Sequence, residues 1–290
     1  MHLVSRPRRS ALYMPASNPR AVEKARGLPA DVVILDLEDA VLPDQKIAAR
    51  EAAVSNVKAG GFGRRELVVR VNGLDTPWGA DDLAAIAQVG PDAVLAPKVR
   101  GPADVEKLAK ALRTAPDHTR LWVMIETVQS VFVLDAIAAA APRLGGLVMG
   151  INDLAREMGA RQTPDRAPFF AAMSLAVSAA RAYNLAVLDG VHNEIEDLAA
   201  LDAVCHQGVD FGFDGKSVIH PSHLETCNRV YSPAVADVSW SRAVMAAFDA
   251  PENQGKGALR VEGRLAELLH RDQARRLVAV ADAILAADAG

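Results

Sequence analysis

Cysteine and aromatic residues are scarce in this sequence. Only two of the 290 residues are cysteine, Cys205 and Cys227, which is too few for the disulfide framework of a secreted domain. Cys205 falls on the interior side of a helical pattern and is expected to be inert. Aromatic residues make up 4% of the chain, which disfavours stacking platforms for single-stranded nucleic acid. The net charge of −4, without a basic patch, also argues against a nucleic-acid partner.

Long apolar segments are missing as well. The sequence contains no run of 18 apolar residues without charge, so we expect no membrane span. The basic residues 1–9 are followed by a run that Pro15, Ser17 and Asn18 interrupt, which does not fit the apolar core of a secretory signal. These absences predict a cytoplasmic protein that binds neither membrane nor nucleic acid.

Hydrophobic residues nevertheless make up half of the chain, and they form short runs rich in β-branched residues. Alanine-rich stretches of helical period separate these runs. Eight such alternations predict the α/β class, with a parallel sheet closed into a (β/α)8 TIM barrel. The continuous apolar character of the runs fits strands buried on both faces. The expected strands are Ala11–Pro15, Val32–Asp36, Leu67–Val71, Ala93–Pro97, Leu121–Ile125, Gly146–Gly150, Ala186–Asp189 and Val209–Phe213.

A shorter helical part follows the eighth alternation. We assign residues 1–234 to the barrel and residues 235–290 to a C-terminal helical extension that serves as a lid. The extension is expected to consist of two helices, Val235–Ala250 and Glu262–Ala287. The polar, glycine-containing segment Pro251–Gly257 is predicted to be a flexible hinge between them.

Polar and charged residues follow the expected strands at their C-terminal ends, which is the rim that carries the active site in (β/α)8 barrels. Glu126 and Asp153 follow two neighbouring strands, so their side chains are expected to converge. Two carboxylates with open positions are a usual arrangement for magnesium, because water and substrate complete the octahedron. The alternative is that both carboxylates cap helices or pair with arginine and lysine.

Two cationic residues occupy the same rim. Arg70 ends the third expected strand, where a guanidinium can bind a carboxylate or a polarised carbonyl of an α-keto acid. The alternative for Arg70 is a salt bridge to Asp36, Glu38 or Asp39. Lys98 follows the fourth strand, and we expect it to balance the charge of the carboxylate cluster.

Glu38 and Asp39 admit three roles. They can bind the metal directly, pair with Arg9 and Lys98, or accept hydrogen bonds from metal-bound water. The third role is favoured, because magnesium sites usually keep several waters. His192 and His220 are candidate acids, although a hydrogen-bonded structural role is the more common one for such histidines.

Seven sequence blocks, taken in their order, resemble the citrate lyase beta-subunit-like proteins, also called the HpcH/HpaI aldolase superfamily. Each block alone is a weak signal, whereas the seven in order are specific. The resemblance covers the chain from Arg9 to the C-terminus. The blocks are Arg9-Ser10-Ala11-Leu12-Tyr13-Met14-Pro15, Asp36-Leu37-Glu38-Asp39-Ala40-Val41, Arg70-Val71-Asn72-Gly73, Pro97-Lys98, Ile125-Glu126-Thr127, Gly150-Ile151-Asn152-Asp153-Leu154 and Gly212-Phe213-Asp214-Gly215-Lys216-Ser217-Val218-Ile219-His220-Pro221.

This resemblance implies a (β/α)8 barrel, Mg²⁺ as cofactor, and cleavage or formation of a 3-hydroxyacyl thioester. It implies a role for each of several residues that match the motifs. Glu126 and Asp153 resemble the metal ligands, with Glu126 also at the substrate, and Arg70 resembles the residue that holds the keto acid. Glu38 and Asp39 resemble the acidic residues around that centre. Contacts to coenzyme A fall near Asn18, Arg20 and Lys24.

Two departures from the family pattern concern the thioester. The CoA-using lyases carry an aspartate in the C-terminal lid, which acts as acid and base in a neighbouring subunit. Here the matching position is Glu267, whose side chain is one methylene longer. The family also has a glycine after the proline of the first strand, where this chain has Ala16.

The resemblance therefore predicts a magnesium-dependent carbon–carbon lyase. Its substrate would be malyl-, citramalyl- or citryl-CoA, cleaved into an acyl-CoA and an α-keto acid. The resemblance also implies a homo-oligomer, either a trimer or a hexamer. Two alternatives remain, a thioesterase acting on the same 3-hydroxyacyl-CoA and a non-catalytic or acyl-carrier-protein-dependent subunit of a citrate lyase complex. A free-standing enzyme is favoured over a subunit, because the chain has its own extension to cover a site.

Overall fold

A computed structural model describes residues 6–288 of the chain. The chain divides into two compact units, and the division falls between Tyr231 and Ser232. The larger unit is an eight-stranded parallel barrel, and the smaller is built from two helices and a β-hairpin. Among the described residues, none of the helices is long and apolar enough to cross a membrane.

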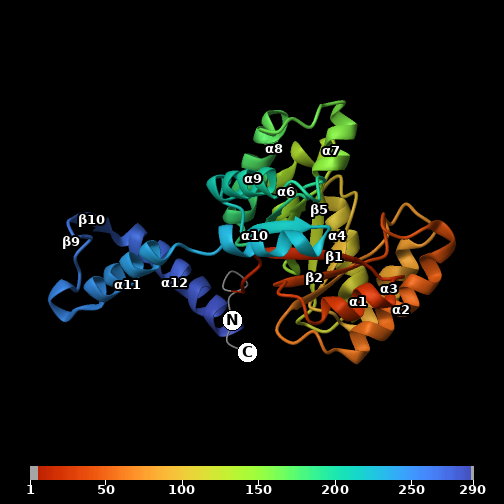
Figure 1. The fold of residues 1–290 in the computed structure, drawn as a ribbon, viewed down its shortest axis with the longest axis horizontal. Helices are drawn as coiled ribbons and strands as arrows, with labels where there is room; N and C mark the ends of the chain where they lie inside the picture. Colours follow the sequence, from red (N-terminus) through yellow and green to blue (C-terminus); the bar gives the residue numbers. More distant parts are fainter. Residues whose placement is uncertain (1–5, 289–290) are drawn as a thin grey trace. The chain divides into compact units, whose positions relative to one another are not determined.

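The barrel confirms the predicted (β/α)8 architecture. Its strands are hydrogen-bonded in chain order, and the eighth pairs with the first to close the sheet. Figure 1 labels β1, β2 and β5 among the helices of this unit. Every strand pair of the barrel is parallel, which fits strands joined by crossover helices. The strands are β1 Ser10–Pro15, β2 Val32–Asp36, β3 Glu66–Arg70, β4 Ala93–Ala96, β5 Arg120–Ile125, β6 Leu144–Met149, β7 Ala186–Asp189 and β8 Gly215–Val218.

Helices follow the strands around the barrel. They are α1 Pro19–Ala25, α2 Lys46–Ala59, α3 Gly79–Val89, α4 Pro102–Ala111, α5 Val128–Val131, α6 Leu134–Ala139, α7 Ile151–Met158, α8 Phe170–Ala182, α9 Leu198–Phe211 and α10 Leu224–Val230. Short 3₁₀ helices add single turns at Pro43–Gln45, Leu112–Thr114, Ala167–Phe169 and Pro221–His223.

The strands are buried on both faces, which explains their continuous apolar character. Alternate residues such as Tyr13, Ile34 and Trp122 form one core cluster, and their neighbours such as Leu12 and Val33 belong to a second, larger cluster with helix residues. The period of two along each strand therefore sorts side chains between the barrel interior and the layer beneath the helices.

The eighth strand was predicted wrongly. Residues 209–213 lie at the end of α9 and in the turn that follows, and the strand begins only at Gly215. Helix α9 continues because its buried residues recur at helical spacing as far as Gly208, and Gly212 ends it with a left-handed φ of 93°. β8 could not be recognised from the hydrophobic pattern because it contains Lys216, and a fully buried lysine is unusual in a strand.

Lys216 belongs to a buried ion cluster that joins β7 to β8. Its ammonium lies 3.0 Å from Oδ2 of Asp189, and Arg166 Nη1 lies 2.7 Å from the same oxygen. Burial disfavours the charged carboxyl, but Lys216 and Arg166 outweigh it and hold the pKa of Asp189 below its ordinary value. The cluster is a structural feature of the barrel, and its carboxylate is fully enclosed.

Replacement of Asp189 by asparagine is expected to lower the free energy of unfolding by about 3–5 kcal/mol, because two buried cations lose their partner. Urea denaturation measures this change. Asp202→Asn is the control, since its partner Arg229 is largely exposed and the loss should stay below about 1 kcal/mol. Equal losses in the two variants would contradict a special role for the buried cluster.

The two cysteines face each other beneath this cluster. Cys205 of α9 and Cys227 of α10 are both buried, and their sulfur atoms lie 3.7 Å apart without a covalent bond. They pack as small apolar side chains between the two helices.

The C-terminal unit differs from the prediction of two helices. Helix α11 Val235–Asp249 and a 3₁₀ turn at Pro251–Asn253 are followed by the antiparallel strands β9 Ala258–Val261 and β10 Arg264–Glu267, and then by helix α12 Leu268–Asp288. The hairpin turn consists of Glu262 and Gly263, both with positive φ, as the favoured two-residue turn requires. The segment Pro251–Gly257 thus connects a helix to a hairpin rather than two helices.

Candidate active site

The C-terminal ends of the barrel strands surround a cavity of about 300 Å³. Side chains from β1, β2, β3, β5 and the β6–α7 connection contribute to its wall. They include Tyr13, Asp36, Asp39, Arg70, Met124, Glu126 and Asp153. The cavity lies at the rim where the sequence predicted the site.

Arg70 is held rigidly at this rim by the carboxylate of Asp36. Its Nε lies 2.6 Å from Asp36 Oδ1 and its Nη2 lies 2.7 Å from Oδ2, a bidentate pair between register partners of β2 and β3. The guanidinium also stacks on the ring of Tyr13, with 4.7 Å between its carbon and the ring centre. Burial opposes ionisation of Asp36, yet the charge and hydrogen bonds of Arg70 hold its pKa below the ordinary value.

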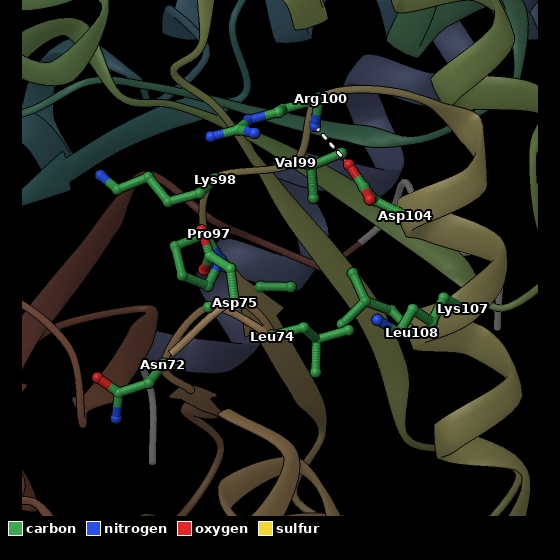
Figure 2. A pocket seen from close by; sticks show the side chains of 12 residues that line it. Asn72, Leu74, Asp75, Pro97, Lys98, Val99, Arg100, Asp104, Lys107 and Leu108 are labelled. Carbon is green, nitrogen blue, oxygen red and sulfur yellow. Dashed lines mark hydrogen bonds between the residues drawn. The ribbon is translucent and has the colours of Figure 1, made fainter. Parts of the chain in front are cut away.

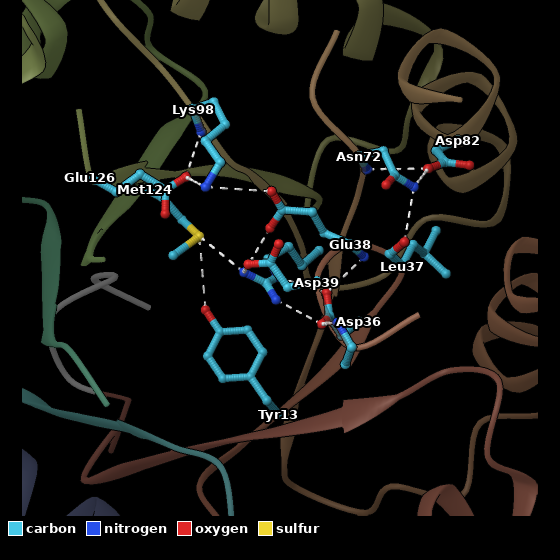
Figure 3. Close-up of polar contacts among 12 residues, drawn as sticks. Tyr13, Asp36, Leu37, Glu38, Asp39, Asn72, Asp82, Lys98, Met124 and Glu126 are labelled. Carbon is cyan, nitrogen blue, oxygen red and sulfur yellow. Dashed lines mark hydrogen bonds and ion pairs between the residues drawn. The ribbon is translucent and has the colours of Figure 1, made fainter. Parts of the chain in front are cut away.

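The remaining edge of Arg70 is directed toward the cavity. Nη1 forms an ion pair of 2.7 Å with Glu38 and lies 3.6 Å from the sulfur of Met124. Figure 3 labels both of these partners. Sulfur is a weak acceptor, so a substrate oxygen can replace this contact at little cost. The salt bridges considered from the sequence are therefore present, and they orient the arginine while leaving one donor for a ligand.

Glu38 and Asp39 flank this free edge in different environments. Glu38 is buried, and its burial raises the pKa of the carboxyl to about 8 despite the neighbouring charge of Arg70. Asp39 is 64% exposed at its side chain, and its Oδ2 lies 3.6 Å from Arg70 Nη1. Glu38 thus belongs to the enclosed network, and Asp39 meets solvent at the cavity.

A second polar network fixes the backbone that carries Glu38. The ammonium of Lys46 donates hydrogen bonds to the carbonyls of Leu37 and Glu38, at 2.8 and 2.7 Å, and to Asn72 Oδ1 at 2.8 Å. Asn72 in turn donates to Asp82, which Figure 3 shows on the far side of the network. The loops after β2 and β3 are therefore held together, and with them Glu38 and Arg70.

Glu126 lies directly after β5 and presents one free carboxylate oxygen. Its Oε1 accepts a hydrogen bond of 2.7 Å from the backbone N–H of Lys98, whereas Oε2 is buried and has no hydrogen-bond partner among the described residues. Burial raises the pKa of Glu126, against the opposing charge of Lys98. Gly150 makes room for this side chain, since a Cβ there would lie 2.5 Å from Oε2.

Asp153 was expected to close the sixth strand, but it lies in the first turn of α7, beyond Gly150. A carboxylate is stabilised there by the positive end of the helix. Its Oδ2 lies 2.5 Å from Lys98 Nζ, and its Oδ1 lies 2.5 Å from Arg156 Nη2. Although partial burial opposes this, Lys98 lowers the pKa of Asp153 and Arg156 adds to the effect.

Lys98 is the cation that the carboxylates share. Its ammonium lies 2.5 Å from Asp153, 3.4 Å from Glu126 and 3.8 Å from Glu38. The residue has a left-handed φ of 55°, which side chains rarely adopt. The charge-balancing position predicted for Lys98 is therefore observed, whereas the guanidinium of Arg9 donates hydrogen bonds to Asp31.

The donor set fits a magnesium ion. Glu126 and Asp153 supply hard carboxylate oxygens from adjacent positions, and Glu126 Oε2 is buried and unpartnered. The described residues contain no group of three or more histidine, cysteine, aspartate or glutamate side chains arranged as a complete metal site. A magnesium ion here would therefore take two protein ligands and complete its shell with water and substrate oxygens.

The residues proposed to contact coenzyme A lie at the same end of the barrel but outside the cluster. Asn18 caps α1 by accepting a hydrogen bond of 3.1 Å from the backbone N–H of Ala21. Arg20 and Lys24 are exposed along that helix. Their position after β1 is compatible with a ligand that approaches the cavity from solvent.

The remaining candidates are His192, His220 and Glu267. His220 bonds to Ser222 through Nδ1, and His192 lies with its ring centre 6.0 Å from that of His223. Burial lowers the pKa of His192, which favours its neutral form. Glu267 ends β10 in the C-terminal unit, where its backbone N–H donates to His270 and its side chain is exposed.

A family model and two relatives of known name place the chain in the same protein family. Residues 9–221 match the family described as HpcH/HpaI aldolase/citrate lyase. The chain is 47% identical over 280 residues to a (3S)-malyl-CoA thioesterase of Cereibacter sphaeroides, covering 97% of this chain and 96% of the relative. It is 32% identical over 308 residues to an L-malyl-CoA/beta-methylmalyl-CoA lyase of the same organism, covering 97% of each chain.

A solved structure agrees with these relatives. The protein CitE of Mycobacterium tuberculosis, in complex with magnesium, acetoacetate and coenzyme A, is 30% identical with a TM-score of 0.74. The match covers 94% of this chain and 97% of that one.

Proposed function

Because the chain belongs to the HpcH/HpaI aldolase/citrate lyase family, we propose that it is a magnesium-dependent hydrolase of a 3-hydroxyacyl-CoA thioester of the malyl-CoA type. The observation that carries the proposal is the combination of an oriented arginine with two converging carboxylates, Glu126 and Asp153, at one cavity. A thioester that also bears a carboxylate fits this combination, since the arginine and the metal each attract oxygen atoms of that substrate.

The thioesterase takes precedence over the predicted lyase for two reasons. The thioesterase relative is 47% identical over almost the whole chain, whereas the lyase relative is 32% identical over a similar length. The chain also has Glu267 where the CoA-using lyases carry the aspartate that protonates the enolate. Hydrolysis needs no proton transfer to carbon, so this departure matters less for a thioesterase.

Each residue of the cavity has a proposed task. Magnesium, when bound, supplies positive charge that polarises a substrate oxygen. Arg70 donates to the substrate the Nη1 hydrogen that otherwise points at the sulfur of Met124, while Asp36 keeps the guanidinium in place. Asp39 is the carboxylate that meets water at the cavity, and it accepts the proton of the water that attacks the thioester carbonyl. The bond from carbonyl carbon to sulfur breaks, and the products are a dicarboxylic acid and free coenzyme A.

A carbon–carbon lyase is the second candidate, favoured by the lyase relatives at 32% identity. In this case the bond to the hydroxyl-bearing carbon breaks, and acetyl-CoA and glyoxylate leave the same cavity. Glu267 would then protonate the enolate from a neighbouring subunit of a homo-oligomer, either a trimer or a hexamer.

The products formed from malyl-CoA by purified protein with magnesium distinguish the candidates. We expect free coenzyme A and malate in equal amounts, measured with a thiol reagent and by chromatography. Glyoxylate and acetyl-CoA without free thiol would identify a lyase. No turnover of malyl-, citramalyl- or citryl-CoA would favour a subunit that works only in a complex or with an acyl carrier protein. Asp39→Asn is the control for the proposed base, and it should slow hydrolysis without abolishing magnesium binding.

A further inference from the structure

Three carboxylates share one ammonium in this site, and that arrangement determines how the site behaves without metal. Lys98 Nζ lies within 3.8 Å of Glu38, Glu126 and Asp153. Without a cation between them, the ionised forms of these partly buried carboxyl groups would repel one another. The ammonium therefore keeps the carboxylates in their converging positions.

The ammonium contacts the two carboxylates that a metal would bind. Glu126 and Asp153 are the proposed magnesium ligands, and Lys98 is paired with an oxygen of each of them. Magnesium requires its ligand oxygens at about 2.1 Å with close to octahedral geometry. A divalent ion and an ammonium that approach the same carboxylates repel each other, so we expect the two cations to compete for them.

The side chain of Lys98 also borders a second cavity that can accept it. A second cavity, of about 170 Å³, lies beside the residue, between the loops that follow β3 and β4 (Figure 2). Asp75 lines this cavity, and its carboxylate forms no ion pair within residues 6–288. The backbone of Lys98 is anchored by Glu126, whereas its four-carbon side chain is 27% exposed and can rotate.

We propose that the Lys98 ammonium is a placeholder for the magnesium ion: it holds the carboxylate cluster together when metal is absent and is displaced into the neighbouring cavity when metal binds. The proposal rests on the magnesium site of the preceding subsection. It gives Lys98 a positioning role, at a residue whose left-handed backbone is strained.

Competition between Lys98 and magnesium has opposite effects on the magnesium affinity and on the stability of the metal-free site. A metal that must displace Lys98 binds less tightly than one that enters a site without a competing cation. The metal-free site, in turn, is less stable when the ammonium is removed, because three carboxylates lose their common partner. Lys98→Met should therefore tighten magnesium binding and destabilise only the metal-free protein. Methionine preserves the length of the side chain and the same strain at positive φ.

Calorimetric titration of magnesium chloride into metal-free protein tests the affinity, and thermal melting with and without magnesium tests the stability. We expect Lys98→Met to bind magnesium roughly tenfold more tightly than the wild type. Its metal-free form should melt roughly 5–10 °C lower, and saturating magnesium should remove most of that difference. Lys110→Met, an exposed lysine of α4, is the matched control and should resemble the wild type in both measurements.

An affinity of Lys98→Met equal to or weaker than that of the wild type would overturn the placeholder role while leaving the magnesium site intact. Absence of magnesium binding by the wild type would instead refute the metal site of the proposed function. If Lys98→Met does not fold, Lys98→Gln serves as the second variant, since it removes the charge and retains polar groups.

Discussion

Replacement of Arg70 by lysine is expected to reduce kcat/KM for the thioester by about a hundredfold or more, the effect of losing one donor to a developing charge. The guanidinium uses Nε and Nη2 to grip Asp36 and keeps Nη1 for the cavity. An ammonium is a single point charge and cannot perform both tasks at once. Steady-state kinetics with malyl-CoA measure the loss.

Arg8→Lys provides a matched control for this variant. Arg8 also forms a buried two-point pair, with Nε 2.6 Å and Nη2 3.0 Å from the carboxylate of Glu66, but at the opposite end of the barrel strands. Both variants weaken a buried arginine–carboxylate pair and should lower the melting temperature to a similar extent. Only Arg70→Lys should lose activity, and near wild-type kinetics for it would mean that the pair with Asp36 is its whole role.

Removal of divalent metal is expected to abolish turnover, and addition of magnesium or manganese should restore it. Among the described residues Glu126 and Asp153 supply two ligands, so a bound ion keeps open positions for substrate. A chelator removes the ion and with it the charge that polarises the substrate oxygen. Activity after EDTA treatment and dialysis measures this, with residual metal determined by elemental analysis. Full activity of a metal-free preparation would exclude the proposed site.

Glu126→Gln should reproduce the effect of chelation in the presence of magnesium. The amide preserves the volume next to Gly150 but supplies a weaker ligand in place of the unpartnered carboxylate oxygen. Retention of magnesium affinity by this variant would contradict the assignment of Glu126 as a ligand.

The barrel could be predicted from the sequence because its strands are short, apolar and separated by stretches of helical period. Strands β2 and β7 have the bounds that the pattern predicted. The eighth strand was missed because its second residue, Lys216, is charged and its burial depends on Asp189, which is distant in the sequence. Hydrophobic pattern alone carries no information about such partners.

The C-terminal hairpin was missed for a different reason. Leu265, Leu268 and Leu269 match a helical spacing, but they lie on a strand and at the start of α12 and are all exposed. The sequence did contain one sign of a hairpin, the dipeptide Glu262-Gly263. Two-residue hairpin turns favour glycine because they require positive φ, and both residues have positive φ here. The residues that gather at the site were predictable by their position after strands, whereas the placement of Lys98 among three carboxylates required coordinates.

The bidentate contact between Asp36 and Arg70 also constrains how the protein can be recombined with its relatives. The two residues are register partners on β2 and β3, and Arg8 fixes the other end of β3 through Glu66. A chimaera with its crossover between residues 36 and 66 would pair strands from different parents and separate these contacts. Residues 8–82, which include Asn72 and Asp82, should therefore be exchanged as one block. A crossover after residue 82 takes Arg70 and its carboxylate partners Asp36 and Glu38 from a single parent.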